Sequence, residues 1–277
     1  MTVEEIIKTL EEHWISNGCL KGYPYDVEKG AGTSNPSTFL MALGPKKWSV
    51  AHLEMCRRPQ DGRYAENPNR VYKHHQFQVF IKPFPVNIEQ LYLESLKKLG
   101  LDPKENDIKF LEDNWAQPTL GAWGLGSEVQ LNGMEITQFT YFQQVGNIDV
   151  DLIPVEIAYG IERLAMYVQN VENVYDLKWN DNLTYGDMFK ESEYQFSKYN
   201  FEVANFENYV KLISIYLEEA QSCLKNHLPL PAYDYVLKAS HAFNILDSTK
   251  KISANERQRY ILEISKVAKS IFHKEEK

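Results

Sequence analysis

The spacing of apolar residues at the start of the chain predicts a helix. These residues recur every three or four positions, at Val3, Ile6, Ile7, Leu10 and Trp14, which places them on one helix face. Thr2 and Glu5 have the spacing of a capping box, which satisfies free backbone amides in a first turn. Asn17-Gly18 is a typical helix end. We therefore expect the chain to open with a helix that stops near residue 17.

From Trp48 to about Glu156 the pattern is mostly that of β-strands, in which polar and apolar residues alternate. A turn-rich segment from Gly22 to Pro36 precedes this region. One helical pattern, near Ile88 to Leu99 and ended by Gly100, interrupts it. We therefore expect this part of the chain to supply the sheet.

The dipeptide Asn132-Gly133 predicts a tight hairpin turn inside this region. The register expected across it pairs Leu131 with Met134, Gln130 with Glu135, and Glu128 with Thr137. Glu128 and Glu135 would then lie close together in the ladder, and such carboxylates beside a triphosphate suit Mg²⁺. Two exposed glutamates without a ligand are the alternative.

A change of period marks the segment Val155 to Val168, which reads first as a strand and then as a helix. Beyond Trp179 the patterns are helical, over roughly 207–224, 233–246 and 254–272, with a second capping box at Ser253 and Glu256. We predict an α+β protein with a mainly antiparallel sheet flanked by helices. Residues 1–178 would form the sheet domain and 179–277 an all-helical C-terminal domain.

Composition excludes several classes of protein. The formal net charge is −8, so a broad basic surface for nucleic acid is not expected on this chain. No run of about eighteen apolar residues occurs, which argues against a membrane span. The three cysteines do not have the spacing of a zinc site or a disulfide framework. Together with an opening segment unlike a secretory leader, this indicates a cytoplasmic protein.

Positive charge is concentrated between Met55 and Lys82, where six Lys and Arg residues face only two acidic ones. The centre of this segment is rich in turn-forming residues, and His75 to Lys82 alternates as a strand would. Arg57 and Arg58 are expected at the end of the preceding strand, with Gln76, Phe77 and Gln78 directly opposite. Such a hairpin can bind phosphate or carboxylate, although a solvated charged loop is the alternative.

Three other features remain open from the residues alone. Arg163 lies beside a buried helix face and needs an anionic partner, which could be Glu162, Glu156 or a bound phosphate. His74 and His75 are adjacent in a strand, so their rings point to opposite faces and cannot share one metal. Cys56 beside an arginine could be a reactive thiolate, but no partner spacing supports a nucleophile.

Several motifs together resemble class II aminoacyl-tRNA synthetases. The chain has an arginine at a strand end, a basic loop, a returning strand opened by Phe77, and G-I-E-R entering a helix at Gly160 to Arg163, as in motifs 2 and 3 of that class. Three longer segments resemble the family of α subunits of bacterial two-subunit glycyl-tRNA synthetases. They are C-R-R-P-Q-D-G-R-Y-A-E-N-P-N-R, D-N-W-A-Q-P-T-L-G-A-W-G-L-G and N-G-M-E-I-T-Q-F-T-Y-F-Q-Q, and the likeness covers nearly the whole chain.

The resemblance implies a class II catalytic core that makes glycyl-adenylate from glycine and ATP with Mg²⁺. It implies an α homodimer within an α₂β₂ tetramer, in which a separate β subunit makes most contacts with tRNA(Gly). This would explain the missing basic face. A related enzyme that acylates another acceptor, and a regulatory subunit that senses an amino acid, are the rival interpretations.

The resemblance also implies roles for individual residues. Arg57 and Arg163 would be catalytic, at the α- and γ-phosphates, and Phe77 would stack on adenine. The ATP site would comprise Arg57, Arg58, Arg63, Arg70, Phe77, Glu135 and Arg163, with Mg²⁺ on Glu135 and Glu128. The glycine pocket would be lined by Thr33, Gln76, Gln78, Trp115, Gln138 and Glu156. Pro59 stands where the class pattern has a glutamate, and motif 3 has fewer glycines than usual.

Overall fold

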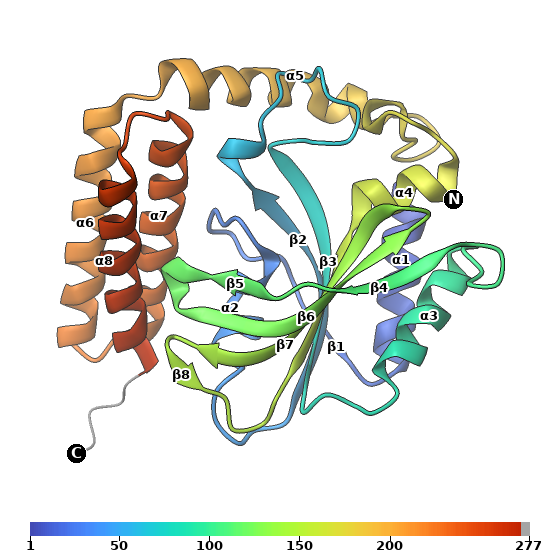
Figure 1. Cartoon of the computed structure of the whole chain (residues 1–277), viewed down its shortest axis with the longest axis horizontal. Coiled ribbons are helices and arrows are strands. Elements are labelled where there is room, and N and C mark those ends of the chain that lie inside the picture. The colour runs from blue at the N-terminus through green and yellow to red at the C-terminus, as the bar shows by residue number, and fades with distance from the viewer. Residues whose placement is uncertain (273–277) are drawn as a thin grey trace.

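The computed structural model describes residues 1–272. They form one nine-stranded sheet with helices packed around it (Figure 1). The strands are β1 (Leu20–Lys21), β2 (Trp48–Arg57), β3 (Lys73–Lys82), β4 (Ile108–Glu112), β5 (Trp115–Gln117), β6 (Ala122–Leu131), β7 (Met134–Val145), β8 (Ile148–Asp149) and β9 (Val155–Gly160). Their order is β1-β2-β3-β9-β7-β6-β4, with β5 beside β6 and β8 beside β7. Only the pairing of β1 with β2 is parallel among the described strands. The predicted fold class is confirmed.

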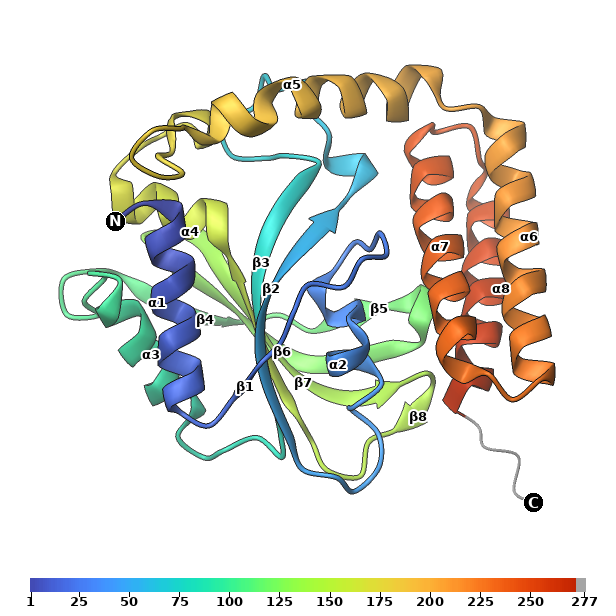
Figure 2. The same cartoon turned by 180° about the vertical axis from the view of Figure 1, so that it is seen from behind.

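Helices flank the sheet and form a separate bundle at the C-terminal end (Figure 2). They are α1 (Val3–Ser16), α2 (Pro36–Phe39), α3 (Ile88–Lys98), α4 (Ile161–Gln169), α5 (Tyr185–Lys198), α6 (Phe206–Lys225), α7 (Pro229–Ser248) and α8 (Ala254–Phe272). The capping boxes predicted before α1 and α8 are both present. Within residues 1–272, no helix is long and apolar enough to cross a bilayer.

Helix α5 is the longest helix that the sequence analysis did not place. It runs along one end of the molecule and connects the α4 side to the C-terminal bundle (Figures 1 and 2). A capping box of Thr184 and Asp187 begins it. Its buried residues are Tyr185, Glu193 and Ser197, and the partly buried Phe189 packs against the core of the sheet. The helix therefore has an apolar face, which the sequence analysis overlooked.

The two faces of the sheet have different surroundings. One face packs with α1, α3 and α4 in an apolar core that includes Phe77, Val79 and Tyr159. The other face contributes residues such as Val50 and Phe80 to a second core, shared with α6, α7 and α8. Because side chains alternate along a strand, each strand supplies both cores, and the polar positions of the second face lie where the cavities form.

The register corrects two details of the prediction. Residue Arg57 pairs with Lys73 rather than with the segment from Gln76 to Gln78, and Glu54 lies opposite Gln76. In the hairpin, the pairs at the turn are confirmed, but Glu128 lies opposite Gln138 and not Thr137. A β-bulge between Val129 and Gln130 shifts the ladder by one residue, which simple counting from the turn cannot anticipate.

Candidate active site

A polar cavity of about 490 Å³ opens on the second face of the sheet; we call it the central cavity. Strands β3, β7 and β9 form its floor, and the loops at 30–34 and 58–71 form part of its wall. Nine of the residues predicted for the site line it: Thr33, Arg58, Arg70, Gln76, Trp115, Glu135, Gln138, Glu156 and Arg163. The sequence therefore located this cavity, although the roles of its residues stay predictions.

Glu156 on β9 is the most buried carboxyl of the cavity, with 2% of its surface exposed. Its Oε2 accepts a hydrogen bond of 2.7 Å from the Thr33 hydroxyl. Its Oε1 is buried and has no hydrogen-bond partner among the described residues. Burial raises the pKa of Glu156 to about 8, against the opposing effect of the Thr33 hydrogen bond. An unpaired carboxyl oxygen inside a cavity is a strong acceptor for a bound cation.

The glutamines of β3 hold the loop that supplies Thr33. Gln76 Oε1 accepts hydrogen bonds from the backbone amide of Gly32 at 3.0 Å and from the Gln78 side chain at 3.1 Å. A Cβ at Gly32 would lie 2.3 Å from Gln78 Nε2, so only glycine allows this close approach. Gln78 is fully buried beneath the loop and does not line the cavity itself.

A buried ion pair fixes the other end of this loop. Lys29 Nζ lies 2.6 Å from Glu54 Oε2, and both side chains are at most 2% exposed. Asn35 also donates to the Glu54 carboxylate, at 2.6 Å. Neither Lys29 nor Glu54 was singled out in the sequence, because the two residues come from a turn-rich segment and a strand with no pattern linking them.

The partner of Arg163 is Glu135, which none of the alternatives had named. Arg163 Nη1 lies 3.0 Å from Glu135 Oε2 and 3.2 Å from the Glu135 carbonyl oxygen. Glu162 instead accepts from the backbone amide of His75, at 2.8 Å, and lies 2.7 Å from its ring. Both members of the Arg163–Glu135 pair line the central cavity and are partly exposed, so their charges are available to a ligand.

Arg57 does not reach the central cavity, which corrects a central expectation. Its Nη1 lies 3.6 Å from Glu28 Oε1, and its guanidinium carbon is 5.8 Å from the Phe196 ring. Arg58 lines the central cavity instead, and its Nε donates to the Gly30 carbonyl at 2.9 Å. Adjacent residues at a strand end point to opposite sides, so the sequence could not decide between the two arginines without the register.

The expected role of Phe77 in the site is also wrong. It is fully buried in the first core and makes an edge contact with the Tyr159 ring, so it cannot stack on a ligand in the central cavity. His74 occupies the other face of β3 and lines the cavity. Burial, then the nearby Arg58 guanidinium, holds the pKa of His74 well below its usual value, so its ring is neutral. Strand alternation was the signal that could have identified His74.

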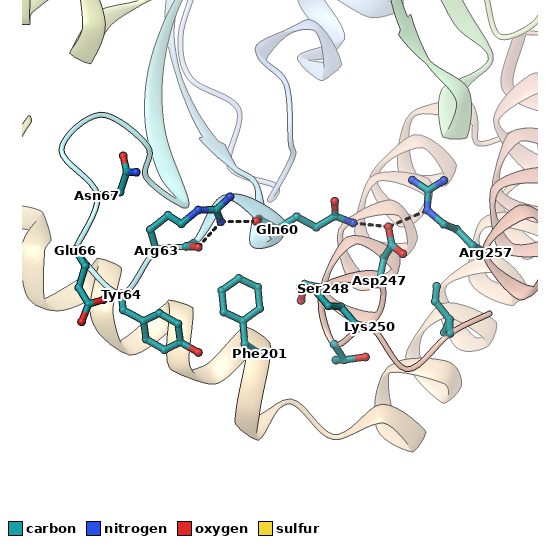
Figure 3. A pocket seen from close by; sticks show the side chains of 13 residues that line it. Gln60, Arg63, Tyr64, Glu66, Asn67, Phe201, Asp247, Ser248, Lys250 and Arg257 are labelled. Atoms are coloured by element: carbon teal, nitrogen blue, oxygen red, sulfur yellow. Dashed lines mark hydrogen bonds and ion pairs between the residues drawn. The ribbon is translucent and has the colours of Figure 1, made fainter. Parts of the chain in front are cut away.

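Arg63 lies at a second, larger opening, a groove of about 1020 Å³ between the loop at 60–67 and the ends of α7 and α8. Its Nη1 donates to the carbonyl of Gln60 at 3.0 Å. Figure 3 shows Gln60 between Arg63 and Asp247, with Arg257 on the far side of Asp247. Arg63 is therefore separated from Arg58 and Arg70, which line the central cavity.

The two glutamates expected to bind Mg²⁺ do not line the same cavity. Glu135 lines the central cavity, whereas Glu128 does not and accepts a hydrogen bond from Gln130. Within residues 1–272, no group of three or more His, Cys, Asp or Glu side chains is arranged to hold a metal ion. Mg²⁺ commonly uses only one or two carboxylates together with substrate phosphates, so Glu135 alone among the predicted pair fits such a site.

Cys56 is not an activated nucleophile. The thiol is fully buried, and burial raises its pKa to about 12. Its Sγ donates a hydrogen bond to Gln76 Oε1 at 3.1 Å. A protonated thiol that is already engaged contributes to the framework of the cavity and not to covalent chemistry.

The family model and the sequence relatives match nearly the full chain. The family described as glycyl-tRNA synthetase alpha subunit matches residues 3–275. The glycine–tRNA ligase alpha subunit of Petrotoga mobilis is 53% identical over 98% of this chain and 94% of its own length. The corresponding subunit of Coprothermobacter proteolyticus is 54% identical over 98% and 93%. A solved pyrrolysyl-tRNA synthetase from Desulfitobacterium hafniense is 12% identical, with a TM-score of 0.49 over 66% of this chain and 73% of its own.

Proposed function

Because this chain belongs to the family of glycyl-tRNA synthetase α subunits, we propose that its central cavity joins glycine to the adenylyl group of ATP. The chain is part of an aminoacyl-tRNA ligase for glycine, and its family uses ATP. Glycine is then transferred to tRNA. The observation that carries the assignment of the cavity is Glu156, a buried carboxyl with one oxygen free.

Glu156 would bind the ammonium group of glycine. Within residues 1–272 this buried carboxyl accepts one hydrogen bond, from Thr33, and it is poorly satisfied without a cationic partner. An ammonium has three donors and no acceptor, so it can complete the bonding of Glu156. Trp115 and Gln138 line the same cavity. Beside them, the bound amino acid would have room for a hydrogen at its α-carbon but little room for a larger side chain. Steric exclusion of this kind selects against added groups.

Three guanidinium groups would bind the triphosphate. Arg58, Arg70 and Arg163 all line the cavity, and guanidinium groups bind phosphate through paired hydrogen bonds. Arg58, not Arg57, would hold the α-phosphate, and Arg163 would hold the leaving pyrophosphate. The neutral ring of His74 would lie against the adenine. In this arrangement a carboxylate oxygen of glycine attacks the α-phosphorus, and the bond from that phosphorus to the pyrophosphate oxygen breaks.

Catalysis would come from positioning and charge stabilisation. The three guanidinium groups of the cavity would stabilise the negative charge on the five-coordinate phosphorus, and no side chain has to act as a nucleophile. Mg²⁺, when bound, would supply further positive charge to the phosphates. Glu135 would be its protein ligand, since this carboxylate lies in the cavity beside Arg163.

The family also supports a proposal for the assembly and for the role of each subunit. The naming of the relatives as alpha subunits supports a β partner for this chain. We propose an α₂β₂ tetramer in which the β subunit makes most contacts with tRNA(Gly), in keeping with the net charge of −8. We also propose that residues 1–178 form the catalytic domain and residues 179–277 a helical C-terminal domain.

Pyrophosphate exchange tests the proposal directly. The purified chain, alone and with its β subunit, is incubated with ATP, labelled pyrophosphate and one amino acid. We expect label to enter ATP with glycine, and at least tenfold more slowly with alanine. If the α₂β₂ assembly shows no glycine-dependent exchange, the central cavity is not the site of glycine activation. Exchange that depends on another acid would identify a different substrate.

A further inference from the structure

Residues 58–72 join β2 to β3, and we call them the β2–β3 loop. Two arginines of this loop, Arg58 and Arg70, line the central cavity. A third, Arg63, lies in the groove shown in Figure 3. The loop contains one short 3₁₀ turn, Pro59–Asp61, and no other helix or strand. Regular secondary structure therefore does not fix the positions of these arginines.

Helix α5 anchors the loop through the carboxyl of Glu193. Its Oε2 accepts from the backbone amide of Tyr72 at 2.7 Å, and its Oε1 accepts from that of Arg63 at 3.0 Å. Ser197, one turn further along α5, donates to the same carboxyl at 3.3 Å and accepts from the backbone amide of Tyr64 at 3.0 Å. The side chains of Glu193 and Ser197 are buried. Helix α5 thus holds the loop at several backbone amides.

The loop is held in a backbone conformation that it would not favour alone. Tyr64 and Ala65 have φ angles of 55° and 61°, in the left-handed region that residues with a Cβ rarely adopt. A Cβ at Gly62 would lie 2.7 Å from Ser197 Oγ, so the loop packs tightly against α5. Figure 3 shows the Tyr64 ring beside Phe201, with centroids 5.8 Å apart. Such a conformation persists only where surrounding contacts outweigh its strain.

Tyr72 connects this anchor to both arginines of the central cavity. Its amide donates to Glu193, and its carbonyl oxygen accepts from the backbone amide of Arg58 at 2.7 Å. Arg70 precedes Tyr72 by two residues, beyond Val71, whose side chain is buried in the first core. A displacement of Tyr72 would therefore change the distance between the two guanidinium groups.

A buried glutamate is an uncommon choice for packing alone, because this residue type is rarely buried without partners. An ionised carboxyl only accepts hydrogen bonds, and its two oxygens can accept from two amides at once. A glutamine of the same shape has one oxygen, and its NH₂ group would face the second amide. The carboxyl of Glu193 therefore specifies where the loop lies, in addition to filling space.

We propose that Glu193 is a positioning residue for ATP binding, which acts through Tyr72 to set the spacing of Arg58 and Arg70 in the central cavity. The proposal rests on the proposed function, which assigns phosphate binding to these arginines. Guanidinium groups bind phosphate through paired hydrogen bonds of defined direction, so their spacing decides how well a triphosphate is held. Glu193 lines neither the central cavity nor the groove of Arg63, so it would act only through the loop.

The test uses the α₂β₂ enzyme and the variant Glu193→Gln. The Kd for ATP is measured by calorimetry without glycine, and the KM for glycine by pyrophosphate exchange at saturating ATP. We expect the Kd for ATP to rise at least about fivefold and the KM for glycine to stay within about twofold, since misplaced binding groups lose affinity. Hydrogen–deuterium exchange should become faster at the amides of residues 63 and 72. Glu191→Gln, the same change at an exposed position of α5, should alter none of these values.

A double-mutant cycle tests whether the spacing of the two arginines carries the effect. Arg70→Ala removes one of them, so Glu193→Gln in that background should change the Kd for ATP by less than about twofold. Ser197→Ala is a milder second variant, which serves if Glu193→Gln does not fold. It removes the hydrogen bond to the Tyr64 amide and should raise the Kd for ATP about twofold to threefold. An unchanged Kd in Ser197→Ala would count against the proposal.

Three further results would overturn the proposal. Faster amide exchange with an unchanged Kd for ATP would show that Glu193 only stabilises the loop. An equal rise in the Kd for ATP and the KM for glycine would indicate a general distortion of the cavity. A full effect of Glu193→Gln in the Arg70→Ala background would exclude the spacing of the arginines. Glycine-dependent exchange by the wild type tests the proposed function separately, because ATP binding and amide exchange are measured without the reaction.

Discussion

The two faces of strand β3 show how one segment serves both stability and chemistry. Phe77 and Val79 enter the apolar core against α1, α3 and α4, and both are fully buried. On the opposite face, His74 and Gln76 line the central cavity and Gln78 lies beneath its loop. Because the alternation is strict, a shift of one residue would exchange the core for the site. On this strand, neighbouring residues in the sequence therefore serve different purposes, one in the apolar core and the next in the cavity.

Phe77→Ala tests the core side of this comparison and should have the largest effect. Removal of a fully buried phenylalanine leaves a cavity and costs about 3–5 kcal/mol of unfolding free energy. We expect this loss in a urea titration of the isolated chain. His74→Ala is the control from the other face, and should cost far less stability while it raises the KM for ATP. The comparison fails if Phe77→Ala keeps its stability and loses ATP binding.

Arg58→Ala and Arg57→Ala form the matched pair for the site. Loss of a group that stabilises transition-state charge typically costs about 10²–10³ in rate, so glycine-dependent pyrophosphate exchange should fall by at least about a hundredfold in Arg58→Ala. The fall in Arg57→Ala should be smaller, since this side chain points to a different cavity. The reverse ranking would mean that Arg57 reaches the α-phosphate after all.

Strand alternation also explains which residues could not be placed from the sequence. Helix α1 and the strand-to-helix switch at β9 and α4 were predictable, because apolar spacing and capping residues are local signals. The resemblance grouped Thr33, Gln76 and Glu156, and these three residues line one cavity; their roles stay predictions. The placing of Phe77 and Arg57 failed because their directions depend on the exact strand register, which tertiary packing sets. Helix α5 was overlooked although it has an apolar face. The contacts of its buried Glu193 could not be predicted, because this carboxyl accepts from the backbone amides of residues 63 and 72, which are distant in sequence.

Glu156→Gln sharpens the assignment of the glycine pocket. A hydrogen bond to a charged group contributes about 1.5–3 kcal/mol, so loss of the carboxylate should raise the KM for glycine roughly tenfold to a hundredfold and leave the KM for ATP nearly unchanged. Glu94→Gln, the same change at an exposed position of α3, is the control and should alter neither constant. An unchanged KM for glycine in Glu156→Gln would remove Glu156 from amino-acid recognition.

The pH dependence of stability offers the most specific test of the same carboxyl. Burial raises the pKa of Glu156 from its ordinary value of 4.5 to about 8, so the folded chain retains a proton that the unfolded chain releases between these values. The contribution of this group is therefore fully present below pH 4.5 and is lost as the pH rises through about 8. One such proton changes the unfolding free energy by at most about 1.4 kcal/mol per pH unit.

The glutamine in Glu156→Gln does not titrate, and all other titratable groups are the same in this variant and in the wild type. The unfolding free energy of wild type minus that of the variant should therefore fall as the pH rises from 5 to 8, when both are measured by urea unfolding without glycine. A difference that stays level would show that the carboxyl is already ionised in the folded chain, through a partner other than Thr33. Saturating glycine should flatten the decline, because an ammonium beside Glu156 favours the carboxylate. That response links the buried face of β9 to the substrate.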